Sequence, residues 1–457
     1  MSDSTVITNK LATEKIGKLI WTYSLPSIVG TLVMSLYNIV DRIFIGQGVG
    51  PLAISGIALT FPFMILLMAF GMLVGAGSAS RISITLGENN KEKAEKILSN
   101  ALILTLIISG AVVILSYIFL NDVLVLFGGS DKTIRYAEEY MRIIIPSGIL
   151  SALNFGFNNI MRASGYPGKA MYTMIICAVI NIVLDPIFIF IFHWGIQGAA
   201  IATNISYLVG TIWVLSHFMQ KSSNIRFYSK NFRLEKDIVK SILSIGMSPF
   251  SMQLATSLII VLVNTSLLKH GGDLAIGAFG IINSINTLIV MIIVGLNQGT
   301  QPIMGYNYGA RLYDRMFNTL KKAILIATGM STLGFVIGTF FPKLISSLFT
   351  PDIELQKIAT HALKISVFMF PLIGSQVVIT NFFQSIGKAK ISIFLSLTRQ
   401  FLFLVPSLFV LPSIFGLDGV WAAMPLSDGL ASIVSFVTIL YFIRKFKAQS
   451  AAELLRN

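Results

Sequence analysis

The sequence is short of the residues that soluble enzymes rely on. Only 12% of its 457 residues are charged, whereas soluble domains carry about 25%. A single cysteine, Cys177, excludes an internal disulfide and leaves no thiolate cluster for a metal. The four histidines (His193, His217, His270 and His361) stand apart, without an HExxH pair. These shortages disfavour a soluble protein and metal or nucleophilic chemistry built on Cys and His.

Acidic residues are scarce relative to basic ones, with 20 Asp plus Glu against 34 Lys plus Arg. In a nucleic-acid-binding protein the basic residues gather on one polar face. Here they lie in short loops between apolar runs, as in membrane proteins that hold their orientation by loop charge. We therefore expect a lipid bilayer as the partner and no nucleic acid.

Hydrophobic residues make up 54% of the chain. Apolar stretches of about 20 residues, long enough to cross the hydrocarbon core, recur along its whole length. Because lipid offers no partner for backbone groups, these stretches must be helices. We predict an all-α integral membrane protein of about twelve spans: 17–44, 52–80, 97–120, 134–160, 170–192, 197–219, 239–268, 274–303, 319–342, 356–384, 391–414 and 419–443.

Basic residues in alternate loops predict the orientation of these spans. About 25 fall on the side that holds both termini and the long central loop near 220–238. Cytoplasmic loops carry the excess of Lys and Arg, so we expect both termini in the cytoplasm. About six fall on the other side: Arg42, Lys132, Arg135, Lys269, Lys343 and Lys357.

An internal repeat divides the chain into halves. Pro26 has a counterpart in Pro249, and further fragments recur at offsets between 219 and 223 residues. Six spans per half is an even number, so the halves are parallel repeats related by a pseudo-twofold axis along the membrane normal. Such halves typically enclose a substrate path; the alternative is a duplicated scaffold without one. We predict six-helix bundles over 1–220 and 239–457, joined by a cytoplasmic linker over 221–238.

Three acids fall well within apolar runs: Asp41, Asp185 and Asp428. A charge there costs about 2.5–3.5 kcal/mol on insertion scales, so each acid needs a reason. Asp41 lies toward the outer end of the first span, with Tyr37 and Asn38 on the same helix face. The alternative for Asp41 is a helix-end acid paired with the arginine that follows it.

Asp185 lies in the outer half of the fifth span, with Asn181 on the same helix face. Pro186 cannot donate a backbone hydrogen bond, which leaves the Ile182 carbonyl without its usual partner. A carboxylate, a carboxamide and a freed carbonyl at one depth suit a proton or a hard cation such as Na⁺. The alternative is a structural hydrogen-bond cluster that braces a kinked helix.

Thr203 of the sixth span and Tyr140 of the fourth reach a similar depth. In the second half, by contrast, the counterparts of Asp41 and Asp185 are about Asn264 and Val405. Because both acids are missing from the duplicate, we expect ion coupling in the N-terminal half.

Asp428 lies near the midplane of the last span. Two interpretations carry equal weight, a second protonation site and an ion-pair partner for Arg399. The chain has no GxxxxGK[ST] motif for a nucleotide. Unless a separate ATPase binds, an ion gradient must therefore supply the energy for any transport.

Several short fragments occur in a fixed order along the two halves. Together they resemble the multidrug and toxic compound extrusion (MATE) family across nearly the full chain. The resemblance implies paired six-helix bundles that alternate between inward and outward openings and export organic, often cationic, compounds against H⁺ or Na⁺. The fragments are Tyr37-Asn38 with Asp41, Arg162–Gly165, Asn181 with Leu184–Pro186, Gly195–Thr203, and Gln301-Pro302 with Asn307–Ala310.

The resemblance also implies an ion site made by Asp41, Asn181, Asp185 and Thr203, with Tyr140 nearby. If the ion is Na⁺, its ligands would come from Asp41, Asn181 and Asp185. Some members carry acids in the seventh and tenth spans, where this sequence has Gln253 and Gln376, so coupling through C-terminal acids is not expected here. Candidates for lining the substrate cavity are Tyr37, Asn38, Asn154, Met174, Gln253 and Asp428.

We therefore interpret the chain as a transporter in a bacterial inner membrane, not an enzyme. It would act as a monomer, without a cofactor, and export small organic cations, drugs or toxic metabolites, by antiport with H⁺ or Na⁺. The nearest alternative is a flippase for lipid-linked oligosaccharide precursors, which needs several basic residues in its cavity to bind a diphosphate. Only Arg142, Lys364 and Arg399 are candidates for that task.

Overall fold

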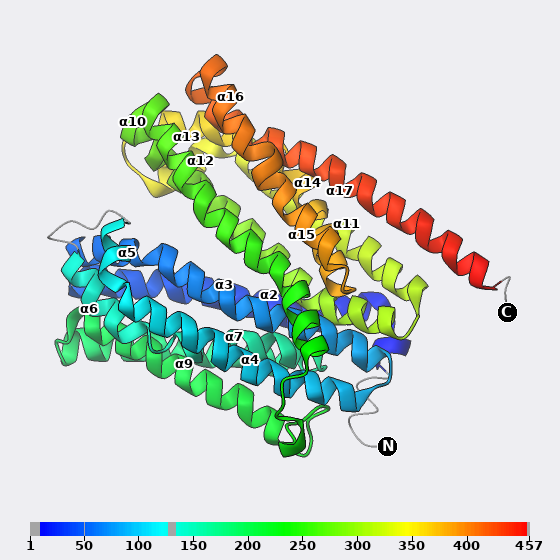
Figure 1. The fold of residues 1–457 in the computed structure, drawn as a ribbon. Helices are drawn as coiled ribbons and strands as arrows, with labels where there is room; N and C mark the ends of the chain where they lie inside the picture. The colour runs from blue at the N-terminus through cyan, green and yellow to red at the C-terminus, as the bar shows by residue number, and fades with distance from the viewer. Residues whose placement is uncertain (1–9, 50, 127–133, 455–457) are drawn as a thin grey trace. The chain divides into compact units, whose positions relative to one another are not determined.

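A computed structural model describes residues 10–49, 51–126 and 134–454 of the chain. These residues form helices and connecting loops, with no β-strand among them, which confirms the all-α prediction (Figure 1). Of the loop charges used to predict orientation, Lys132 lies outside the described residues.

The described chain forms two compact units. The first comprises residues 1–254, 294–319 and 384–389, and the second comprises residues 255–293, 320–383 and 390–457. The predicted bundle limits, 1–220 and 239–457, stay a prediction.

The first unit contains most of the N-terminal half of the chain. Its helices are α2 (Ile16–Gly48), α3 (Pro51–Gly87), α4 (Lys91–Ile118), α5 (Leu120–Leu126), α6 (Ile134–Ile144), α7 (Gly148–Ala163), α8 (Pro167–Pro186), the π-helical segment η1 (Ile187–Ile191), α9 (Gly195–Met219), the short η2 (Ser229–Asn231) and both ends of α10 (Lys236–Gly309).

The second unit takes the middle of α10 and most of the chain after it. Its remaining helices are α11 (Tyr313–Phe340), α12 (Pro342–Phe349), α13 (Ile353–Ser366), α14 (Phe370–Ser385), α15 (Ala389–Leu397), the π-helical segment η3 (Thr398–Leu404), α16 (Val405–Phe415) and α17 (Leu417–Leu454).

The membrane spans agree with the predicted ranges. Nine helices of the described chain are long and apolar enough to cross a bilayer, and eleven spans result when each of two bent helix pairs counts as one. Helix α10 has 74 residues, about 111 Å at 1.5 Å per residue, more than three times the ~30 Å hydrocarbon core. It leaves helical geometry at Gly272, so it holds two spans. Counted this way, the described chain has the twelve spans predicted.

Both bent spans break at a proline. The pair α6 and α7 is bent by 59° around Pro146, and the pair α13 and α14 by 56° just before Pro371. A proline has no N–H to continue the helix and its ring crowds the preceding turn. The two prolines are 225 residues apart, close to the offset of the repeat, so the bend is itself duplicated.

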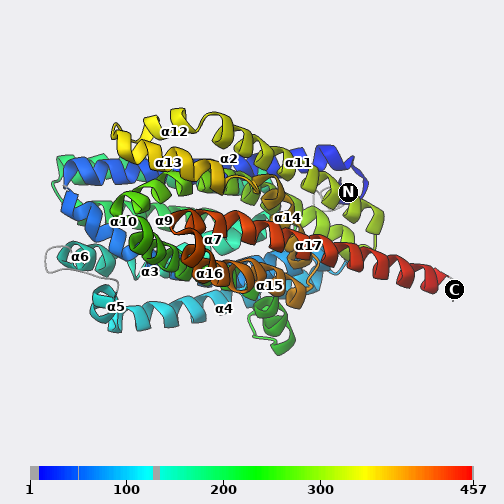
Figure 2. The same ribbon diagram turned by 90° about the horizontal axis from the view of Figure 1, so that it is seen from above.

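Small residues bring α3 and α7 together in the first unit. Gly71 lies against Ala152, and a Cβ added at Gly75 would overlap the backbone of Gly156. Two helices that each carry small residues four apart can approach closely, which strengthens van der Waals packing in lipid. Helices α3, α4 and α7 accordingly pack side by side (Figure 1 and Figure 2).

The fragment Gln301–Ala310 belongs to the first unit because it packs on α3 and on Leu11, which precedes α2. Gln301 donates from Nε2 to Ser80 Oγ at 2.6 Å. Asn307 donates to the Leu11 carbonyl at 3.3 Å, and Gly309 lies against the Ile84 carbonyl. The sequence fragment therefore joins the ends of α3 and α10 to the start of the chain.

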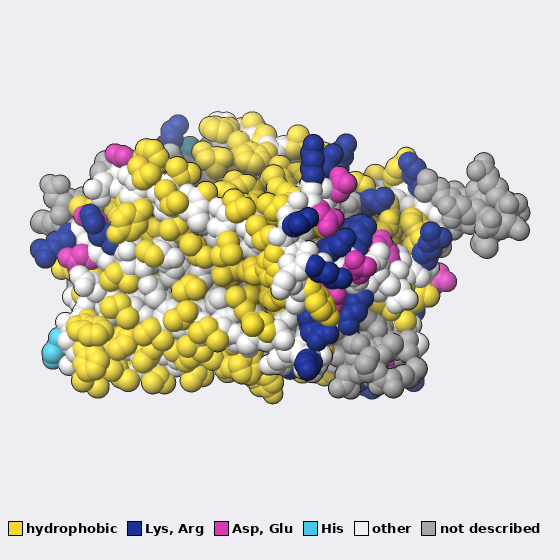
Figure 3. All heavy atoms as spheres, turned by 60° about the horizontal axis from the view of Figure 1, so that its bottom comes forward, with side chains coloured by type: hydrophobic (Ala, Val, Ile, Leu, Met, Phe, Trp, Pro, Cys, Tyr) yellow, Lys and Arg dark blue, Asp and Glu magenta, His cyan; other side chains and the backbone are white. Residues whose placement is uncertain are grey.

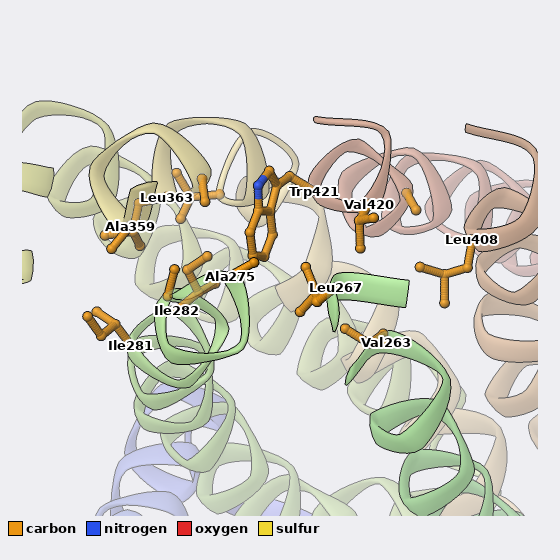
Figure 4. Close-up of a cluster of buried hydrophobic side chains, with 14 of the residues drawn as sticks. Val263, Leu267, Ala275, Ile281, Ile282, Ala359, Leu363, Leu408, Val420 and Trp421 are labelled. Carbon is orange, nitrogen blue, oxygen red and sulfur yellow. The ribbon is translucent and has the colours of Figure 1, made fainter. Parts of the chain in front are cut away.

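Apolar packing forms the core of the second unit around the buried Trp421. Val263 and Leu267 precede Gly272, Ala275 follows it, and all three belong to the same buried cluster (Figure 4). Helix α10 therefore folds back on itself. Gly272 has φ +66°, in the left-handed region that glycine adopts without a Cβ clash.

The surface of the described chain carries broad hydrophobic areas, beside which Lys and Arg side chains gather (Figure 3). Large apolar side chains are well exposed; Trp21 and Leu348 have 68% and 77% of their surface accessible. An exposed apolar surface of this kind is suited to lipid.

Candidate functional site: a buried carboxyl pair

Helix α8 carries the centre of the candidate site. It packs against α2 on one side and α9 on the other. Asn181 and Asp185, one turn apart on α8, have no exposed surface. Pro186 ends the α-helix, and the chain continues as the π-helical segment η1. π-Helical segments occur mostly as single-turn bulges within α-helices, and such bulges are frequent at functional sites.

Two glycines allow η1 to pack closely against its neighbours. A Cβ at Gly48, the last residue of α2, would overlap Ile189, and one at Gly198 of α9 would press on Phe188. The ends of α2, α8 and α9 are therefore held against each other beside the two acids. This explains the glycine at position 198, within the motif at the start of the sixth span.

The carboxyl groups of Asp41 on α2 and Asp185 on α8 lie within hydrogen-bonding reach of each other. Two ionised carboxylates have no proton to share, so this contact is a hydrogen bond only when one of them is protonated. Arg42, the alternative partner of Asp41, contributes a nearby favourable charge from an exposed position. The geometry thus joins the two acids that the sequence places in the outer halves of the first and fifth spans.

Four acceptor oxygens at this point have no hydrogen-bond donor among the described residues. They are Asp41 Oδ1, both carboxyl oxygens of Asp185, and Asn181 Oδ1. Buried acceptors without partners cost about 1–3 kcal/mol each, more when charged. An acceptor-only set of this kind suits a proton or a small hard cation.

Asn181 is held by the sixth span. Its Nδ2 donates to Thr203 Oγ1 on α9 at 3.2 Å, which leaves Oδ1 as the free acceptor beside Asp185. Among the described residues there is no group of three or more His, Cys, Asp or Glu side chains that could hold a metal. If the ion is Na⁺, the oxygens of Asp41, Asn181 and Asp185 are the ones that fit it.

Tyrosines surround the acids. Tyr37 of α2 and Tyr140 of α6 are buried, and Tyr140 interacts electrostatically with both Asp41 and Asp185. Tyr207 of α9, which sequence reasoning missed, is hydrogen-bonded to Tyr37 and to Ser151. Tyr207 lies four residues after Thr203 and therefore on the same helix face, which was the one signal in the sequence that pointed to it.

Changing Tyr207 to Phe removes the hydroxyl and leaves the ring in place. We expect transport to fall roughly two- to tenfold, because a net hydrogen bond contributes about 0.5–1.5 kcal/mol. The measurement is the rate of fluorescent-cation efflux per amount of protein in the membrane. The matched control is Tyr172→Phe on α8, whose ring is exposed; equal losses in both variants would argue against a role for Tyr207.

Other predicted cavity residues lie elsewhere. Asn38 is exposed and donates to the Met34 carbonyl of its own helix at 2.6 Å. Asn154 donates to the Cys177 sulfur at 3.3 Å, where Gly210 also packs. Met174 lies against Gly30, and Gln253 is half-buried on α10.

In the second unit, Asp428 pairs with Arg399. The guanidinium Nε of Arg399 donates to Asp428 Oδ1. Of the two equal interpretations of Asp428 from sequence, the ion pair is the one that the structure contains.

The MatE family model matches two segments of the chain, residues 26–187 and 249–410. The chain belongs to the MatE family. The second match begins 223 residues after the first, at the proline equivalent to Pro26, which confirms the internal duplication. The family is one of multidrug export transporters in membranes, so the resemblance to the MATE family is also confirmed.

Curated and solved relatives agree with this assignment. The chain is 28% identical to the multidrug export protein MepA of Staphylococcus haemolyticus (strain JCSC1435) over 442 residues, 97% of each chain. It matches a crystal structure of MATE in the bent conformation with TM-score 0.92 and 26% identity, over 97% of this chain and 99% of that one. An outward-facing multidrug resistance MATE family transporter gives TM-score 0.90 at 26% identity, over 96% and 98%.

Proposed function

We propose that this transporter is an antiporter in which inward movement of H⁺ or Na⁺ through the Asp41–Asp185 pair drives export of small organic cations. The observation that carries the proposal is the contact between the buried carboxyl group of Asp185 and the half-buried one of Asp41. Three of their four oxygens are buried without a hydrogen-bond donor among the described residues. A like-charged pair in a medium of low polarity cannot keep both charges without a neutralising ion. The pair is therefore a site that must bind and release a positive charge.

The coupling follows from the helices that hold the two acids. Neutralisation removes the repulsion between Asp41 on α2 and Asp185 on α8. The chain beside Asp185 is weakened by Pro186 and is π-helical over Ile187–Ile191. A change at the acids is therefore transmitted to the end of α2, which packs on η1 at Gly48. Each charge that moves inward supplies about 2.3 kcal/mol per 100 mV of membrane potential.

The predicted orientation defines which way export would run. We propose that the protein is a monomer in a bacterial plasma membrane, and its loop charges favour a cytoplasmic position for both termini. Export then runs from the side that carries about 25 basic loop residues toward the side that carries about six.

The test is transport by the purified protein in vesicles, with the proton gradient and the sodium gradient imposed separately. We expect ethidium movement to follow one of the two gradients and to stop when an ionophore collapses it. Transport that proceeds equally under both, under neither and with ionophore would overturn the antiport mechanism.

The flippase alternative is not favoured. Of its three candidate basic residues, Arg142 pairs with Glu138 at 2.6 Å and Arg399 pairs with Asp428. Lys364 is exposed on α13. Two of the three charges are therefore already neutralised by acids, which leaves little to bind a diphosphate.

A further inference from the structure

A second set of polar side chains lies inside the second unit. We call Gln376, Arg399, Gln400 and Asp428 the C-terminal polar layer. Asp428 is 2% exposed, while the side chain of its partner Arg399 is 30% exposed. The guanidinium therefore reaches from an accessible position to a buried carboxylate.

Hydrogen bonds link the helices that carry the layer. Gln400 of η3 donates to Thr256 Oγ1 on α10 at 3.1 Å. Ser432, one turn after Asp428 on α17, donates to the Leu372 carbonyl of α14 at 3.5 Å, and Gln376 is one turn after Leu372. Gln376, Gln400 and Asp428 each lie roughly 15 Å along the helix from an end of their span, so they share the middle of the bilayer.

Two acceptor oxygens of the layer lack a hydrogen-bond donor in the described part of the chain. The Oε1 atoms of Gln376 and Gln400 are buried without a hydrogen-bond donor among the described residues, and both side chains are at least 95% buried. The one full positive charge in the layer is on Arg399. A ligand that supplies several N–H groups and a positive charge fits this arrangement.

The repeat gives an independent reason to regard the layer as a site. With the offset of 221 that relates Gly198 to Gly419, the counterpart of Asp428 is Tyr207. With the offset of 225 between the two bend prolines, the counterpart of Gln376 is Ser151. Tyr207 and Ser151 are hydrogen-bonded beside the coupling acids of the first unit. The duplicated scaffold thus places a carboxylate where the first half has a neutral hydroxyl.

We propose that the C-terminal polar layer binds the cationic group of the exported compound, and that a guanidinium, amidinium or primary ammonium group replaces Arg399 on Asp428. The proposal deepens the export function proposed above and rests on it for the cargo. Exchange of one N–H cation for another keeps the buried carboxylate neutralised throughout, which avoids the large cost of an unpaired buried charge. Arg399 lies in the π-helical segment η3, a local irregularity of the kind found at functional sites.

The test is equilibrium binding to the purified full-length protein in detergent, without any ion gradient. The probes are p-aminobenzamidine, which carries N–H donors, and tetraphenylphosphonium, which has none. We expect Asp428→Asn to weaken p-aminobenzamidine at least about tenfold, because hydrogen bonds to a charged partner are the strong ones. Tetraphenylphosphonium binding should change less than about twofold, since it cannot replace the bonds of Arg399.

Arg399→Gln keeps the proposal falsifiable if Asp428→Asn folds poorly. Removing the competing guanidinium should tighten p-aminobenzamidine binding about three- to tenfold, the opposite of what damage to the fold produces. Asp418→Asn is the matched acid control on the same helix, since Asp418 is exposed and pairs with His361; it should change neither affinity.

If Arg399→Gln weakens both probes alike, or the three variants leave p-aminobenzamidine unchanged, the pair is a structural brace and the proposal is wrong. Gradient-independent ethidium movement would overturn the antiport mechanism and leave this binding result standing, so the two failures can be told apart.

Discussion

Asp185→Asn should reduce gradient-driven efflux to background while the protein stays folded in the membrane. Asparagine has nearly the shape of aspartate but cannot take up or release a proton. The substitution leaves the bond between Asn181 and Thr203 in place. It removes the negative charge that makes the contact with Asp41 require a cation. We expect a loss of at least about a hundredfold, as for other groups that act as a unit.

The measurement is ethidium efflux from energised cells, normalised to protein in the membrane fraction. Asp41→Asn should be equally inactive, and the double variant no worse than either single one, because in the proposed mechanism the two carboxyl groups bind one ion together. The matched control is Asp237→Asn, an exposed acid in the first turn of α10, which should transport normally. Undiminished efflux by Asp185→Asn would remove the basis of the ion site.

Gly246→Leu should have the second largest effect. Helix α10 crosses α3 in the first unit at two glycines, Gly246 and Gly77. A Cβ at Gly246 would overlap the Leu73 carbonyl, and one at Gly77 would overlap the Ile242 carbonyl. The obstacle is backbone, which cannot rotate aside as a side chain can. Overpacking costs about 1–3 kcal/mol even in cores that can adjust, so we expect at least about a tenfold loss of efflux.

Thermal unfolding of the detergent-purified protein shows whether the loss comes from packing, because Gly246→Leu should lower its midpoint by several degrees. Gly110→Leu on α4 is the matched control, since a Cβ there meets nothing within 4 Å. If both variants unfold and transport alike, the crossing of α3 and α10 is not as tight as the structure indicates.

The sequence predicts those residues of the candidate site whose presence in a membrane span carries a large free-energy cost. Asp41 and Asp185 are conspicuous because a carboxylate inside an apolar run is expensive, and Asn181 follows from the helix period. Tyr207 and Ser151 carry no such signal. Tyrosine and serine are common in membrane helices, and only the packing of α2, α7 and α9 brings these two together with Tyr37. For Asp428, too, packing had to decide, because the sequence supported a proton site and an ion pair with Arg399 equally.

By itself, the sequence determined the number, order and approximate ends of the spans. The length of an apolar run and the position of a proline are local properties, and lipid forces each run to be helical. The sequence also revealed the duplication, because a repeat can be found by comparing one half of the chain with the other. The tertiary structure alone decided which helix faces meet, because a contact between two helices depends on how both are packed and not on either sequence segment alone. Arg399 therefore meets Asp428, Asp41 meets Asp185, and glycines mark the crossings where backbones touch.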